Sequence, residues 1–378
     1  MATSVTFFVH GFLMATWLPN IPVVKDRLQL DPATLGLALA ATAVGSLVFM
    51  PVAGWLVAHR GSAPVTIGAA LLACLALPLP FLAPNAALLA LALFVLGASS
   101  GSMDVAMNAQ AVRVEALRTT PIMSSFHGAW SLAALAGAVT TSLVHLAGIP
   151  ALAQVVTVSL VAALVQIVVA IEFERGDHAD EPPVLLAIPP RVVLGLGFAC
   201  FCAMLAEGAV GDWSAVYLRE DLGAAAAVAP LGYAASSLAM ALGRLTGDAV
   251  VRRFGAASTI VVGGILVVVG MSAGLLLAQP FAAIAGFALV GLGLANAVPV
   301  MFSAAGRVRD VPAGTALASA STMGYTGFLV GPTVIGLVAQ ATSLTTALWI
   351  PAICGLVLVV AGPAALARIV PQPARAAA

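Results

Sequence analysis

Charged residues are scarce in this chain. Aspartate, glutamate, lysine and arginine make up 8% of its 378 residues, whereas hydrophobic residues make up 62%. Soluble domains carry about 25% charged residues, so the composition predicts an integral membrane protein. The fifteen acidic and fifteen basic residues balance, and this balance gives no indication of a nucleic-acid partner.

Cysteine and the motifs of enzymes are also rare or missing. The four cysteines lie in apolar runs, and the spacing of Cys200 and Cys202 fits no common metal or redox motif. We expect them to be small buried hydrophobic residues. The sequence has no phosphate-binding loop, no metal-ligand cluster and no nucleophile–base pair at a usable spacing. It therefore predicts no cofactor and no metal, and it argues against a nucleotide-driven pump.

Long apolar runs dominate the rest of the chain. The first twenty residues lack the basic start and the cleavage site of a signal peptide, so we expect them to form a first transmembrane helix. Segments of about 20 apolar residues can span a bilayer as helices. The sequence predicts twelve of them, near 2–24, 33–58, 64–84, 87–112, 121–147, 150–172, 191–218, 224–251, 257–279, 281–305, 312–339 and 343–367.

One longer connection divides these spans into two groups of six. It is acidic and rich in proline, and it has no apolar periodicity, so it reads as a solvated linker. The predicted organisation is an all-α membrane protein with an N-terminal six-helix bundle at 1–172, a cytoplasmic linker at 173–190 and a C-terminal six-helix bundle at 191–378.

The arginines predict the orientation in the membrane. If the N-terminus is cytoplasmic, most arginines fall in inside loops or the C-terminal tail, and the outside loops hold only Lys25, Arg27 and Arg219. Cytoplasmic loops carry the excess of basic residues in membrane proteins. We therefore expect a bacterial inner-membrane protein with both termini in the cytoplasm.

The two halves also repeat each other at an offset near 194. Gly97 matches Gly291, Arg113 matches Arg307 and Gly137 matches Gly331. The loop that ends at Gly61 likewise matches the one that ends at Gly255. Ordered matches at one offset indicate a duplicated six-span unit.

Polar residues inside the spans mark the candidate site. The stretch 97–138 carries Asp104 and Asn108 on one predicted helix and His127 on the next, within stripes of small and polar residues. A carboxylate in hydrocarbon costs several kcal/mol, so such a residue normally faces a protein interior or a water-filled path. A structural hydrogen bond between helices is the alternative for each of these side chains.

Other spans carry polar residues in a pattern with a period of three. Span one has His10, span seven has Glu207 and Asp212, span ten has Asn296, and span eleven has Tyr325, whereas the interiors of spans three, six, nine and twelve carry no charge. The pattern predicts that the first span of each triplet lines a central cavity and that the third faces lipid. His59, His145 and His178 lie in loops or at helix ends and receive no role.

Several motifs resemble those of the major facilitator superfamily. The twelve spans in two halves, the central loop and the run from Gly243 to Arg253 carry the likeness, and the first-half copy of that run has Ala58 where an aspartate is usual. The stretches 104–108, 125–131, 207–218 and 324–332 resemble a bacterial branch near the fucose permeases. The resemblance implies alternating access around a site at mid-membrane. It also implies a cytoplasmic latch, which would be formed by Arg60, Arg244, Asp248 and Arg252.

We therefore expect a monomeric secondary transporter, coupled to protons, that moves a small polar solute such as a sugar or polyol. The substrate-binding candidates are Asn108, Trp17, Trp130, Trp213, Asn296 and Tyr325. The proton-coupling candidates are Asp104, Glu207, His10, His127 and Asp212. Two alternatives stay open, namely proton-driven efflux of hydrophobic or cationic drugs, and a polytopic membrane enzyme that uses His127 and Asp104.

Overall fold

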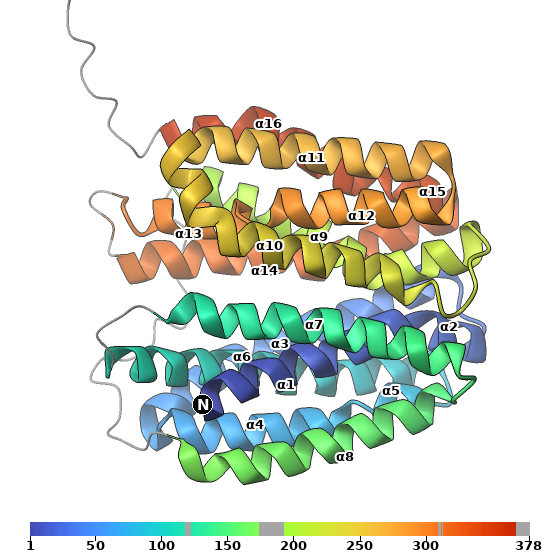
Figure 1. Ribbon diagram of the computed structural model, residues 1–378, viewed down its shortest axis with the longest axis horizontal. Coiled ribbons are helices and arrows are strands. Elements are labelled where there is room, and N and C mark those ends of the chain that lie inside the picture. The colour runs from blue at the N-terminus through green and yellow to red at the C-terminus, as the bar shows by residue number, and fades with distance from the viewer. Residues whose placement is uncertain (118–121, 174–192, 309–310, 312, 368–378) are drawn as a thin grey trace, which may run out of the picture.

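The computed structural model describes residues 1–117, 122–173, 193–308, 311 and 313–367, and every regular element in them is a helix. The predicted linker at 173–190 lies outside the described residues, except for Phe173. Figure 1 shows two helical bundles side by side, one formed by the first half of the chain and one by the second.

Each bundle contains six spans, some of which are built from more than one helical segment. The first bundle consists of α1 (Ala2–Trp17), η1 (Leu18–Asn20), α2 (Ile21–Leu28), α3 (Pro32–Arg60), α4 (Ser62–Ala76), α5 (Leu79–Leu82), α6 (Ala86–Ala116), α7 (Met123–Leu146), α8 (Ala151–Val169) and η2 (Ala170–Glu172). The second consists of α9 (Leu194–Val216), η3 (Tyr217–Asp221), α10 (Pro230–Phe254), α11 (Ala256–Leu277), α12 (Pro280–Leu294), α13 (Ala297–Ala305), α14 (Ala313–Ala341), α15 (Leu344–Ala347) and α16 (Trp349–Ala367).

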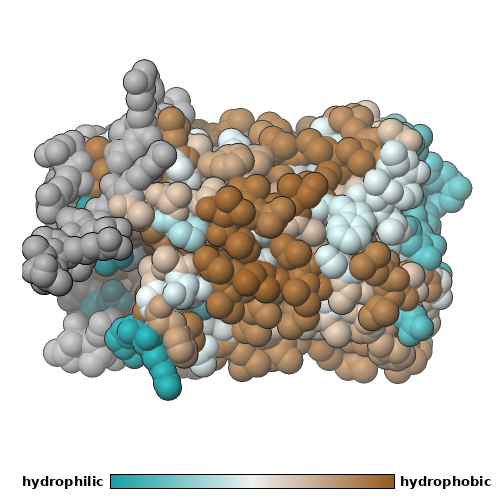
Figure 2. Space-filling model, turned by 90° about the horizontal axis from the view of Figure 1, so that it is seen from above, coloured by the Kyte–Doolittle hydropathy of each residue, from teal (hydrophilic) through white to brown (hydrophobic). Residues whose placement is uncertain are grey.

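The twelve predicted spans are confirmed. Eleven helical segments of the described chain are long and apolar enough to cross a membrane. The remaining span, α10, has the length but carries Arg244, Asp248 and two further arginines. Figure 2 shows a hydrophobic band around the middle of the molecule, with polar residues gathered toward its ends.

Prolines interrupt several spans at predictable places. Span one passes from α1 through the 3-10 turn η1 into α2, with Pro19 and Pro22 at the joints. Span ten breaks at Ala295–Asn296, and Pro299 follows in the first turn of α13. Proline has no N–H for the helical ladder, so the chain turns before it. At the start of α3, Asp31 accepts hydrogen bonds from the hydroxyl and the backbone N–H of Thr34, and these bonds lower the pKa of its carboxyl group.

The internal repeat is visible in the backbone. Gly61 and Gly255, 194 residues apart, both link the second and third spans of their bundles with φ of 82°, and their ψ values are 159° and 157°. A φ of this size favours glycine. Gly97 packs against the carbonyl oxygen of Thr42, and 194 residues later Gly291 packs against that of Ser236.

At one end, which we call the sealed end, close backbone contacts and an ion pair join the two bundles. There α3 meets α14 through two glycines: a Cβ on Gly36 would lie 2.3 Å from the carbonyl oxygen of Pro332, and one on Gly336 would lie 2.4 Å from that of Pro32. Lys25 and Glu220 form an ion pair of 2.7 Å between α2 and η3. Since α1 begins at the opposite end, the sealed end holds the loops that follow spans one, five and seven.

Candidate functional site: a cavity between the bundles

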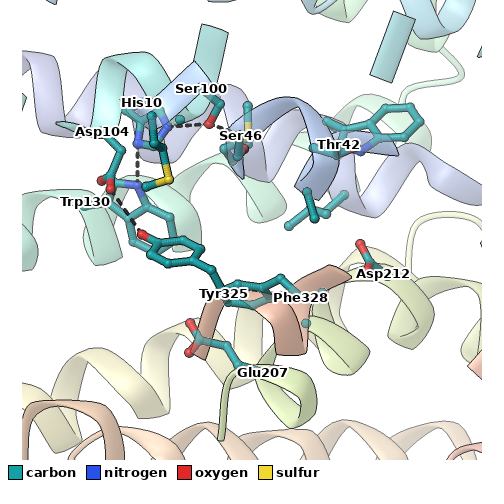
Figure 3. A pocket seen from close by; sticks show the side chains of 18 of the residues that line it. His10, Thr42, Ser46, Ser100, Asp104, Trp130, Glu207, Asp212, Tyr325 and Phe328 are labelled. Carbon is teal, nitrogen blue, oxygen red and sulfur yellow. Dashed lines mark hydrogen bonds between the residues drawn. The ribbon is translucent and has the colours of Figure 1, made fainter. Parts of the chain in front are cut away.

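A cavity of about 350 Å³ lies between the two bundles. The first bundle contributes side chains from α1, α3, α6 and α7, and the second contributes side chains from α9, α10 and α14. Figure 3 shows His10, Ser100, Asp104 and Trp130 on one side, facing Glu207 and Tyr325 on the other. The described residues of α4, α8, α11 and α16, which belong to the third span of each triplet, contribute none of its lining.

Asp104 is the polar link between the bundles at the middle of the cavity. The Tyr325 hydroxyl donates to Oδ2 of Asp104 over 3.3 Å, and this bond crosses from α14 to α6 (Figure 3). On the same helix, Nδ2 of Asn108 donates to Oδ1 of Asp104 over 3.2 Å and to its backbone carbonyl over 2.8 Å. Asn108 therefore orients the carboxylate, and Tyr325 donates a hydrogen bond to it from the other bundle.

His10 belongs to a second hydrogen-bonded group on the same wall. Trp130 Nε1 donates to His10 Nδ1 over 3.0 Å, and His10 Nε2 lies 2.7 Å from the hydroxyl of Ser100. An indole nitrogen can only donate, so Nδ1 of His10 must accept and its proton must sit on Nε2. Trp130 thereby holds His10 in one neutral tautomer, and the hydrogen-bond partners of the imidazole are a tryptophan and a serine.

Replacing Trp130 by phenylalanine is expected to release this tautomer. The ring of phenylalanine keeps most of the packing but cannot donate to Nδ1, so the His10 imidazole should populate both neutral tautomers. Nitrogen-15 NMR of the histidine side chains measures this directly. A single Nε2–H tautomer that persists in Trp130→Phe would contradict the assignment.

Arg244 also lines the cavity, although its motif suggested a cytoplasmic latch. Its guanidinium lies 3.8 Å from Oε1 of Glu207, and both side chains are about one-quarter to one-third exposed. Tyr233 lines the same wall from one end of α10. Eleven residues separate Tyr233 from Arg244, which places them within about 20° on a helix. That spacing was the signal in the sequence for a cavity-facing arginine.

The remaining latch candidates lie elsewhere. Asp248, Arg252 and Arg60 are exposed toward the end opposite the sealed one. Arg244 therefore lines the cavity, whereas these three residues do not.

The other predicted site residues divide into two groups. Asp212, His127 and Trp17 line the cavity, although Trp17 is almost fully buried and packs edge-on against Phe81. Trp213 and Asn296 do not line it. Trp213 is fully buried in the core, because it follows Asp212 by one residue and points away from the cavity face of α9.

Asn296 has a structural position at the break of span ten. Its Nδ2 donates to the carbonyl of Gly243 over 3.2 Å, and its side chain fills the space left by Gly247. The hydrogen bond holds the broken span against α10. The prediction from the period of three is therefore correct for spans one, four and seven, which line the cavity. It is wrong for span ten, from which no described residue lines the cavity.

The sequence analysis missed several lining residues. Thr42, Ser46 and Ser100 are small hydroxyl residues on otherwise apolar helices, and Phe328 lies three residues after Tyr325. The Thr42 hydroxyl has no hydrogen-bond partner in the structure. In the described residues no group of three or more histidine, cysteine, aspartate or glutamate side chains is arranged to hold a metal, and the four cysteines are free and buried, as predicted.

Comparison with known proteins gives a family and several relatives. The family model described as the Major Facilitator Superfamily matches residues 3–195 and again residues 196–378. An uncharacterised MFS-type transporter of Yersinia pestis is 38% identical over 92% of this chain and 90% of its own length. The membrane protein MosC of Rhizobium meliloti is 35% identical, over 92% of this chain and 85% of its own length. An uncharacterised transporter of Sinorhizobium fredii is 32% identical, over 94% and 95% of the two chains.

Among solved structures, the nucleoside transporter NupG has the same fold. A mutant form of that protein superimposes with a TM-score of 0.74 over 96% of this chain and 98% of its own, at 14% sequence identity. Another NupG structure gives a TM-score of 0.69. At this level of identity the likeness concerns the fold alone.

Proposed function

Because this chain belongs to the Major Facilitator Superfamily, and is a transporter rather than an enzyme, we propose that it moves a small polar solute, with a sugar or polyol favoured, by proton-coupled alternating access. The observation that carries this proposal is the Asp104–Tyr325 hydrogen bond across the cavity. A carboxylate placed between two movable bundles can exchange a proton and change their contact in the same step.

The arrangement of the bundles supports alternating access. The arginine pattern predicts that the sealed end faces outward and that the end where the chain begins faces the cytoplasm. In that orientation, a conformation closed at the sealed end would be an inward-facing state. Two rigid bundles that rock about a central site would then open the other end, as expected for a transporter built from repeats.

The lining of the cavity supports a small polar solute. Its volume of about 350 Å³ is near the lower end of the range for small-molecule pockets, about 300–1,000 Å³. Aromatic rings, including Trp130, Tyr325 and Phe328, stand beside hydroxyl and carboxylate groups. Rings can stack on a sugar face, while the acidic residues can accept hydrogen bonds from its hydroxyls.

The charges of the cavity make an organic anion a poor fit. Asp104, Glu207 and Asp212 face it, with Arg244 as a cation held near Glu207. An anionic solute would have to compete with these carboxylates for Arg244. The same excess of carboxylates, set among aromatic rings, favours drug efflux with a hydrophobic cation as the second candidate function.

Proton coupling follows from the chemistry of Asp104. As a carboxylate it is a strong acceptor for the Tyr325 hydroxyl, and protonation removes the charge that strengthens this bond. Binding of a solute hydroxyl at Asp104 would compete with Tyr325 for the same oxygen. Proton and solute therefore both act on one contact between the bundles, which is the requirement for coupling.

A ligand panel tests the proposed substrate class. A ligand that binds the folded protein raises its melting temperature, by an amount that grows with its concentration relative to Kd. We expect a hexose or polyol to stabilise the purified protein and to exchange across proteoliposomes. Nucleosides, which the name of NupG suggests, and cationic dyes complete the panel. Stabilisation by cationic dyes alone would favour efflux and contradict the sugar or polyol assignment.

Trp130→Ala provides the control for the panel. The substitution removes an aromatic ring that lines the cavity. We expect at least about a fivefold loss of affinity for the stabilising solute, since stacking on an aromatic face is worth about 1 kcal/mol or more.

A further inference from the structure

The sealed end contains a buried polar network that the proposed transport site does not use. Asn20, at the end of η1, is fully buried, and its Nδ2 donates to the carbonyl of Thr16 over 2.8 Å and to Oε1 of Gln154 over 3.2 Å. Gln154 in turn donates through Nε2 to the hydroxyl of Thr141 over 2.7 Å, and that hydroxyl donates to the carbonyl of Gly137. The donor and the acceptor of each hydrogen bond in this network are fixed by these contacts.

His145 completes the network and connects it to the other bundle. Its Nε2 lies 2.9 Å from Oδ1 of Asn20, and its Nδ1 lies 3.0 Å from the carbonyl oxygen of Ala226, in the loop before α10. The Asn20 amide cannot be turned around, because its oxygen would then face the carbonyl of Thr16. Oδ1 of Asn20 must therefore accept, as must the carbonyl of Ala226.

Both ring nitrogens of His145 must donate, and only the protonated imidazolium has two N–H groups. A neutral ring would leave one nitrogen lone pair facing an acceptor oxygen. The position supports the charge, because His145 lies in the last turn of α7, where the helix dipole favours a cation. A second hydrogen bond joins the bundles beside this contact, because the Ser142 hydroxyl of α7 donates to the carbonyl of Ala227.

Several charged groups around this end have other partners, and the Asp26 carboxylate is exposed. Lys25 pairs with Glu220, Arg219 donates to the carbonyl of Ala224, Arg27 donates to the carbonyl of Pro80, and Thr345 donates to Asp221. The helices packed against α7 are α1 with η1, α6 and α8 in its own bundle and α10 in the other. At His145, η1 presents Asn20, and α8 presents Gln154 behind it. Both hydrogen bonds of the His145 ring are thus to neutral oxygen acceptors.

We propose that His145 is a proton-binding site of the sealed end, and that binding of a proton there locks the two bundles together. The site is distinct from Asp104, and the inference rests on the alternating access of the proposed function. When the sealed end opens, Ala226 moves away and the neutral ring again suffices for Asn20. The closed state therefore binds one proton more than the open state. The closed state therefore gains stability relative to the open state as the pH falls and loses it as the pH rises.

Distances across the sealed end test the proposal. Spin labels at Ile149 and Gln279 would report on the two bundles, because both positions are exposed and lie in loops at this end. In double electron–electron resonance, we expect the ratio of closed to open conformations to rise as the pH falls from 8 to 6, by up to about tenfold per pH unit, the limit for one proton.

Variants of His145 separate this site from other titrating groups. His145→Gln can donate to only one of the two acceptors, so its ratio should stay low and lose most of its dependence on pH. His145→Arg keeps a permanent positive charge and several donors, so its ratio should stay high at both pH values. His59→Gln is the matched control, because His59 lies at the other end of α3 and its hydrogen bond is to the carbonyl of Trp55 in its own helix.

Two results would overturn the proposal: a wild-type ratio that does not change with pH, or a His145→Gln variant that keeps the full wild-type response. Failure of the proposed function has a different signature. It would be seen as a lack of solute exchange by the wild-type protein at a single pH, which the distance measurement does not use.

Discussion

Replacing Asp104 by asparagine is expected to abolish accumulation of the transported solute against its gradient, while exchange of solute across the membrane persists. Asparagine has the same shape, and its Oδ1 can still accept from Tyr325, but it cannot bind and release a proton. A difference of one pH unit stores about 1.4 kcal/mol per proton, which supports about tenfold accumulation of a neutral solute. In proteoliposomes we therefore expect the accumulation ratio to fall from about tenfold to about one.

Exchange of labelled for unlabelled solute separates loss of coupling from loss of folding. Asp104→Asn should retain exchange within about threefold of the wild type. Asp26→Asn is the matched control, since this exposed carboxylate near the sealed end lies outside the cavity, and it should keep full accumulation. Unchanged accumulation in Asp104→Asn would remove Asp104 from the coupling step and leave Glu207 or Asp212 as the remaining cavity carboxylates.

Replacing Gly36 by valine is expected to hold the sealed end open. The new Cβ would lie 2.3 Å from the carbonyl oxygen of Pro332, on the backbone of the other bundle, so that a rotamer change cannot relieve the clash. Overpacking of this kind costs about 1–3 kcal/mol. If that cost falls on the closed state alone, the ratio of closed to open conformations drops by roughly five- to a hundredfold.

The spin-label pair at Ile149 and Gln279 measures this shift as well. Gly68→Val is the matched control, because a Cβ at Gly68, in α4, would meet nothing within 4 Å. Both variants place valine in a helix, and only the one at Gly36 should change the distances. If Gly36→Val leaves the distances unchanged, then α3 and α14 do not close the sealed end in the way the structure indicates.

The fold could be predicted from the sequence to a large extent. The twelve spans follow from composition and length, which a bilayer constrains strongly. The duplication was visible at Gly97 and Gly291 before the structure placed each against the equivalent residue of the neighbouring helix. The breaks in spans one and ten coincide with prolines.

The site was only partly predictable, because residues on one helix do not reveal which neighbour they meet. Asp104, Glu207 and His10 were found as polar residues in apolar spans, but the bond from Tyr325 to Asp104 joins residues 221 positions apart. Arg244 was assigned to a cytoplasmic latch because of its motif. The rotation of α10 about its own axis instead places Arg244 at the cavity. In the sequence, His145 was a residue at a helix end without a role. Only the orientation of the Asn20 amide shows that both ring nitrogens of His145 must donate hydrogen bonds.

Proton movement driven by the solute is the most direct test of coupled transport through this cavity. Wild-type proteoliposomes would start with equal pH on both sides and no solute inside, and the stabilising solute from the panel would be added outside while the internal pH is followed. Proton-coupled transport predicts a change in internal pH that follows solute entry and is missing in Asp104→Asn. Entry of the solute at the wild-type rate with no change in pH would contradict it.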